Sequence, residues 1–170
     1  MKTEQVQDWL QIVGLIGVIA SLIFVGQQLK QDRNIAIGEA WLQYTETQVS
    51  LAQLINEHVD IWVTGLAGAE LAPLDRVKFN QIAYAVESKY AGRYSRSKLG
   101  VRVAPAQSVV RELAHDLYAN KGLRRAVFTR WDRLESISGR ERPFYAEVRR
   151  YLAMIDNGEV EPVNPNDYVQ

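Results

Sequence analysis

Few residues in this chain have the types and the spacing that a catalytic or metal site requires. One of its two histidines, His115, follows Glu112 at the spacing Glu-x-x-His. Helical di-iron bundles use two such steps on facing helices together with two further carboxylates. The other histidine, His58, has Ile55 rather than a glutamate at the matching position, so only half of the motif is present. We therefore expect Glu112 and His115 to form an exposed i,i+3 pair, off the apolar stripe of their helix, and not a metal site.

A second group of ionisable residues, Glu57, His58 and Asp60, lies near the end of a long helical pattern. His58 falls beside the apolar face that carries Ile55 and Trp62. A packed, hydrogen-bonded histidine is therefore expected here in preference to a catalytic one. The chain contains no phosphate-cradling loop, nucleophile elbow or zinc-protease signature.

Tyr90, Arg93 and Tyr94 recur at helical spacing and are a candidate lining for a small ligand pocket. The alternative is that the tyrosines are core residues whose hydroxyls reach polar partners. Because the chain has no cysteine, disulfides, thiolate zinc sites, iron–sulfur clusters and cysteine nucleophiles are excluded. We expect no cofactor, no metal and no catalytic residue, and hence a protein that is not an enzyme.

The strongest local signal is an uncharged apolar run from Trp9 to Gly26, WLQIVGLIGVIASLIFVG. Its 18 residues would span roughly 27 Å as a helix, close to the hydrocarbon thickness of a bilayer. The run is apolar on all sides, which is not typical of a surface helix. We predict a transmembrane helix over residues 9–29 after a short flank, residues 1–8.

Two alternatives to a retained anchor stay open. A cleaved signal peptide would have a basic start and a small-x-small cleavage site, whereas here Lys2 is offset by Glu4 and Asp8. A buried core helix would also accommodate a run of this length. Lys30 and Arg33 follow the run, and the positive-inside rule then favours a cytoplasmic C-terminal domain.

Small and polar residues share one face of the predicted anchor. Gly14, Gly17, Ser21, Phe24 and Gln28 follow one another at spacings of three and four. Gly17 and Ser21 form a small-xxx-small pair, which allows close approach of a second helix. This face is predicted to pack against another copy or a larger membrane partner, although glycine is also simply common in membrane helices.

After the anchor, helical spacing of apolar residues continues with no sustained strand alternation. We predict that the anchor continues into a long helix that ends near Gly65 and Gly68, and that the next helix covers residues 75–97. Three further helices follow, punctuated at Pro105, at Asn120–Gly122, at Ser138–Gly139 and at Pro143. The predicted fold is all-α: an N-terminal transmembrane helix followed by a bundle of about four helices. The helical domain is assigned to residues 30–157 and an irregular tail to 158–170.

The amino-acid composition is sufficient for a packed core, but it does not indicate a binding partner. The 170 residues are 47% hydrophobic, and 20 basic residues balance 20 acidic ones. Zero net charge argues against nucleic acid as a partner. Basic residues nevertheless predominate between Arg93 and Arg150 and include the pairs Arg124–Arg125 and Arg149–Arg150. These could attract anionic headgroups or an acidic partner, or they could simply form solvated helix faces.

The stretch IASLIFVGQQLKQDRN resembles the start of a broad group of uncharacterised bacterial proteins with one membrane helix. The later segments GLRRAVFTRWDRLES and RPFYAEVRRYLA are similar to the C-terminal helices of that group. The resemblance implies a membrane anchor, an α-helical soluble part and no particular activity.

Together these observations predict a non-enzymatic, single-pass protein of the bacterial inner membrane. Its expected partners are the lipid bilayer and either itself, as a homo-oligomer, or a larger membrane complex in which it is an assembly or accessory subunit. The alternative is a membrane-anchored helical sensor or a domain that binds a small ligand or lipid.

Overall fold

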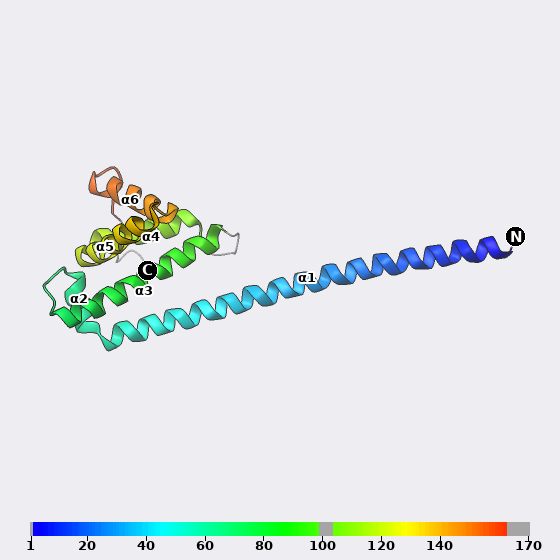
Figure 1. Ribbon diagram of the computed structural model, residues 1–170, viewed down its shortest axis with the longest axis horizontal. Helices are drawn as coiled ribbons and strands as arrows, with labels where there is room; N and C mark the ends of the chain where they lie inside the picture. Colours follow the sequence, from blue (N-terminus) through cyan, green and yellow to red (C-terminus); the bar gives the residue numbers. More distant parts are fainter. Residues whose placement is uncertain (1, 99–103, 163–170) are drawn as a thin grey trace. The chain divides into compact units, whose positions relative to one another are not determined.

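The structure, a computed structural model, describes residues 2–98 and 104–162, and every regular element within these ranges is a helix (Figure 1). The predicted all-α fold is therefore confirmed. The chain divides into two units, residues 1–47 and 48–170. The end of the predicted tail, residues 163–170, lies outside the described ranges.

The first unit is part of one long helix, whose last residues belong to the second unit. Helix α1 (Lys2–Glu57) runs without interruption through the predicted transmembrane segment, so the predicted continuation of that segment into a long helix is confirmed. The segment's apolar side chains are exposed: Val13, Leu15, Ile16, Val18, Ile19, Leu22, Ile23, Phe24 and Val25. By its length and composition α1 is a candidate membrane span. Signal sequences near an N-terminus have the same length and composition.

The long helix ends earlier than its sequence pattern indicates. We predicted an end near Gly65, but the backbone leaves helical geometry at His58, with φ −129° and ψ 33°. A separate short helix, α2 (Val59–Leu66), follows. This prediction was wrong because neither glycine nor proline marks the break, and the apolar spacing continues across it.

The second unit contains the bundle. Its helices are α3 (Pro73–Lys98), α4 (Ala106–Ala119), α5 (Lys121–Ser138) and α6 (Pro143–Asp156). Helix α4 packs against α3, α5 and α6, and α2 packs against α3 and α5. Prolines open α3 and α6, where a missing backbone N–H costs nothing. Gly139 ends α5 in the left-handed region, at φ +68°, where a residue without Cβ is favoured.

Trp131 of α5 lies at the centre of the core and is fully buried. Its ring stacks on Tyr145 of α6, with ring centroids 4.3 Å apart, and on Phe128 one turn earlier, at 5.4 Å. Leu113 and Leu117 of α4 are also fully buried in this core. One continuous apolar cluster thus joins α3 through α6 and gives the polar residues described below a rigid frame.

Candidate functional site

The predicted packing face of the anchor lies on open surface. Gly14, Gly17, Ser21 and Gln28 are all exposed, and a Cβ atom built on either glycine would meet nothing within 4 Å. The Ser21 hydroxyl donates to the carbonyl of Gly17 at 2.9 Å, so its hydrogen bond is made within the helix. The face can therefore approach another helix without an unsatisfied hydroxyl, and the packing hypothesis stays a prediction.

The predicted pocket tyrosines are core residues with polar ends. The Tyr90 hydroxyl donates to Asp116 Oδ2 of α4, and the Tyr94 hydroxyl donates to Glu147 Oε1 of α6, each at 2.6 Å. Burial, reinforced by Asp116, raises the pKa of Tyr90. Burial together with Glu147 raises the pKa of Tyr94 to about 12. Both hydroxyls remain protonated donors at neutral pH and tie α3 to its neighbours.

Arg93, the third residue of the predicted pocket, forms a two-pronged ion pair with Glu112 of α4. Tyr90, Arg93 and Tyr94 therefore do lie along one side of α3, as their spacing predicts, but each one reaches an acidic residue of another helix. These contacts identify interhelical ties, and a ligand pocket at these residues stays a prediction.

The expectation for the Glu-x-x-His step was wrong in one respect. His115 is buried rather than exposed, and its ring meets the edge of Tyr151 at 5.8 Å. Burial lowers the pKa of His115 and favours its neutral form. Its i,i+3 neighbour Glu112 turns to Arg93 instead. Within residues 2–98 and 104–162, no group of three or more His, Asp or Glu side chains could hold a metal ion.

The other acidic–histidine group does not converge on one site. His58 is half-buried at the junction of α1 and α2, whereas Glu57 and Asp60 are exposed. Nothing in this arrangement places a carboxylate against the imidazole, so it offers no acid–base pair in the described structure.

In each of the arginine pairs Arg124–Arg125 and Arg149–Arg150, one arginine forms ion pairs and the other lines a cavity. Arg124 pairs with Asp156 through two contacts of 2.6 and 3.1 Å. Arg149 reaches three carboxylates, those of Asp132, Glu135 and Glu141. The second member of each pair, Arg125 or Arg150, has no ion pair with any described residue and lines a cavity. The sequence identifies the arginine pairs, but it does not predict which arginine of each pair forms the ion pair.

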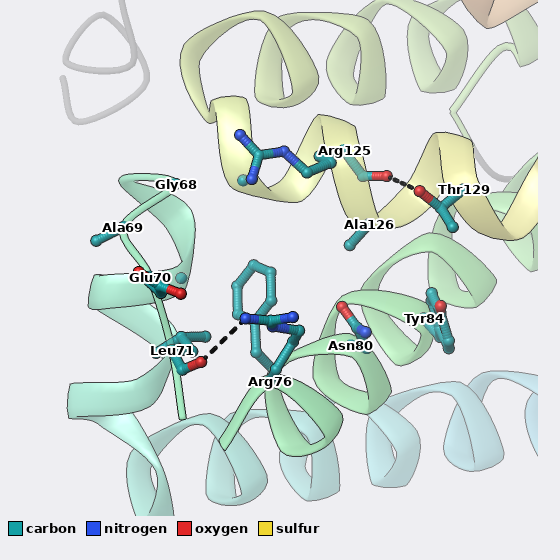
Figure 2. A pocket seen from close by; sticks show the side chains of 13 residues that line it. Gly68, Ala69, Glu70, Leu71, Arg76, Asn80, Tyr84, Arg125, Ala126 and Thr129 are labelled. Atoms are coloured by element: carbon teal, nitrogen blue, oxygen red, sulfur yellow. Dashed lines mark hydrogen bonds between the residues drawn. The ribbon is translucent and has the colours of Figure 1, made fainter. Parts of the chain in front are cut away.

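The first cavity lies between α2, α3 and α5 and has a volume of about 450 Å³, the size of a small-molecule site (Figure 2). Arg76 and Asn80 reach into it from α3, and Arg125 and Thr129 lie on α5. Phe79, Leu71 and Ala126 supply its apolar lining.

Close backbone contact fixes the walls of this cavity. A Cβ atom on Gly122 would lie 1.7 Å from the Gly65 carbonyl oxygen, and a Cβ on Gly65 would lie 2.2 Å from the ring of Phe79. Only glycine permits this approach of α5 to α2. The contact between Gly65 and Gly122 therefore fixes α5 against α2 where both helices line the cavity.

A second cavity, of about 460 Å³, lies where α3, α4 and α6 meet. Lys98, Arg111 and Arg150 bring positive charge to it, against the single carboxylate of Glu147. Glu147 already accepts the Tyr94 hydroxyl. This cavity is comparable in size but lacks the glycine-to-glycine contact that fixes the walls of the first.

Glu87, which the sequence analysis did not single out, is the most deeply buried charged residue described. It is 1% exposed, and burial raises its pKa, opposed by interactions with Trp131, Arg130 and Tyr145. Arg130 Nε lies 3.8 Å from Oε2, while Oε1 has no hydrogen-bond partner in the described structure. Glu87 lies four residues after Ala83 and three before Tyr90, both buried on α3, and this spacing is the only signal of its burial in the sequence.

We compared the chain with protein-family models, curated proteins and solved structures, and none of the three comparisons produced a match.

Proposed function

We propose that this chain is a non-enzymatic single-pass membrane protein that acts as an assembly or accessory subunit of a larger membrane complex, or as a homo-oligomer. The observation that carries the proposal is the exposed apolar surface of α1. Between Val13 and Leu29 the helix has no charged residue, and none of its side chains there is buried.

The energetics of this surface support a bilayer environment. Apolar surface costs roughly 25 cal/mol for each Å² left in water. Phe24 is 61% exposed and Leu22 is 66% exposed, and their neighbours on every side of the helix are similar. Because the exposed residues surround the helix, a single protein partner on one face would leave the others in water. Lipid covers all faces at once.

Charge supports the orientation that we propose, with the bundle in the cytoplasm. Lys30 and Arg33 follow the apolar run directly and would lie on the cytoplasmic side of the membrane. The bacterial inner membrane is proposed because of the resemblance of the N-terminal segment to small bacterial proteins with one membrane helix.

The test of assembly is the native mass of the full chain after extraction in mild detergent, with identification of what migrates with it. A particle that contains other proteins in fixed ratio supports the accessory subunit. A particle made only of this chain supports the homo-oligomer. A monomer in every detergent tested would overturn the assembly role while leaving the anchor in place.

Gly17→Leu tests the packing face directly. We expect it to lower the assembled fraction, since the larger side chain blocks close approach of a second helix. Gly26→Leu is the matched control, because Gly26 lies nine residues later, about two and a half turns, on the opposite face. A Cβ atom built on either glycine meets no other element of the chain within 4 Å. Equal effects of the two substitutions would contradict the predicted face.

A second candidate function is a membrane-anchored helical sensor or ligand-binding domain. The cavity between α2, α3 and α5 favours it, because its walls are fixed and its lining combines apolar and charged groups. The two functions are compatible, since the first depends on α1 and the second on the bundle.

A further inference from the structure

We infer that the cavity between α2, α3 and α5 binds a small organic anion, with a phosphate or carboxylate group held by Arg76 and Arg125 and an apolar body against Phe79. The inference rests on the second candidate function and names its ligand class. It is independent of the anchor and of assembly.

The guanidinium groups of Arg76 and Arg125, which line the cavity, form no ion pair with any described residue. Arg76 donates one N–H to the carbonyl of Leu71 at 3.3 Å, and an arginine has five such donors. Arg125 has no ion pair with any residue in the described ranges, although its neighbour Arg124 pairs with Asp156. Two planar donors from different helices thus border one space, an arrangement suited to an oxyanion.

The remaining polar lining limits the charge of the ligand. Glu70 contributes one carboxylate, and it forms no ion pair with either arginine. Two guanidinium groups and one carboxylate leave a net charge of +1 on the lining, which a single anionic group balances. Asn80 lies on α3, one turn after Arg76, and lines the same cavity with an amide that can donate to the anionic group.

The apolar part of the lining indicates more than an inorganic ion. Phe79 is buried and packs against Trp62, with ring centroids 5.5 Å apart, so its ring is held in place. Leu71 and Ala126 also line the space. A cavity of about 450 Å³ exceeds what a bare oxyanion fills. The ligand is therefore a small molecule with an apolar body, or an anionic lipid headgroup with the start of its chains.

The hydrogen bond from Arg76 to Leu71 also positions the site. It ties α3 to the segment that leaves α2, where Gly68 takes a left-handed conformation at φ +75°. This hydrogen bond places the Arg76 guanidinium at the cavity before any ligand arrives, and the contact between Gly65 and Gly122 places α5 there. A site formed in advance loses less conformational entropy on binding.

The test is calorimetric titration of the full chain in a neutral detergent with phenyl phosphate, benzoate and dihexanoyl-phosphatidylglycerol, and with phenol as the uncharged control. We expect at least one anion to bind and phenol not to. Binding of phenyl phosphate or benzoate identifies a soluble ligand, and binding of the lipid alone identifies a headgroup. Binding of phenol alone would retain a ligand cavity but overturn the anion. Binding of no probe would overturn the inference.

Variants locate the site. Arg76→Gln and Arg125→Gln should each weaken anion binding roughly ten- to hundredfold, as expected for loss of a charged donor. Glu70→Gln should strengthen it, because it removes the like charge. Arg133→Gln, on an exposed arginine of α5 outside the cavity, is the matched control and should bind as the wild type does. Equal binding by all four variants would place the anion elsewhere and overturn the assignment.

These outcomes are distinguishable from failure of the assembly proposal. Loss of anion binding in Arg76→Gln leaves the native mass of the detergent-extracted particle unchanged. Both arginines are exposed, so circular dichroism should confirm that their variants keep the helical content of the wild type.

Discussion

Residues 13–29 and the bundle use the same kinds of apolar side chain in opposite ways. Between Val13 and Leu29 of α1 the apolar residues follow one another around the helix without a charged residue, and they are exposed. In α4, α5 and α6 they recur on one stripe and are buried in a single core. The difference shows that continuity of the apolar run, more than its total hydrophobicity, separates a segment that needs an apolar solvent from one that makes its own core.

The largest expected effect concerns the bundle. Trp131→Ala should lower the free energy of unfolding by about 3–5 kcal/mol, because a fully buried ring and its stack on Tyr145 are lost. Urea denaturation of the full chain in neutral detergent measures it. Trp41→Ala is the control in the other unit, where the ring is 60% exposed, and it should leave bundle stability nearly unchanged. Comparable losses from the two variants would remove the distinction between the units.

The next effect concerns the anchor. Ile19→Arg places a charge at the middle of the apolar run and should oppose membrane insertion by about 2.5–3.5 kcal/mol. The measurement is the share of protein recovered with membranes. Ile137→Arg introduces the same charge at an exposed isoleucine of α5 and should not change that share. If Ile19→Arg also had no effect, the segment would not be a membrane span.

Glu87 gives the bundle a pH dependence. Burial raises its pKa in the folded state, so the folded chain holds a proton that the unfolded chain releases. The free energy of unfolding should therefore fall as pH rises from the usual glutamate pKa through the raised one. Glu87→Gln should reduce this slope without abolishing it, because burial also raises the pKa of Asp116. Glu57→Gln, at an exposed position, should keep the slope of the wild type. An unchanged slope in Glu87→Gln would assign it to another group.

The smallest effect separates the members of one arginine pair. Arg124→Gln breaks the partly exposed pair with Asp156 and should cost about 1 kcal/mol or less. Arg125→Gln breaks no ion pair in the described structure and should leave stability unchanged. The same urea denaturation checks both variants. Equal losses would mean that Arg125 also contributes to stability and would weaken the division between structural and cavity arginines.

The helices could be predicted from the sequence because their signals are local. Apolar spacing identified α3 through α6, and Pro143 and Gly139 marked two of their ends. The break at His58 was not predicted because no glycine or proline lies there to indicate the end of a helix. The burial of His115 was missed because Tyr151, which covers it, comes from another helix.

The candidate site depends on longer-range contacts and was correspondingly harder to predict. Arg124 and Asp156 are separated by 32 residues, so no local pattern shows which arginine of the pair is occupied. Gly65 and Gly122 meet only after α2 and α5 pack together. We predicted a pocket at Tyr90 and Tyr94 because tyrosines at helical spacing are easily recognised in a sequence. Glycines that allow two helices to approach each other beside a cavity are not recognised in this way.

The most direct test of the central claim is fractionation of cells that express the full chain, followed by an alkaline wash of the membranes and then by detergent. If α1 is a membrane anchor, the protein should sediment with membranes, resist the wash and be released only by detergent. Recovery in the soluble fraction before any detergent is added would contradict the anchor and the function proposed from it.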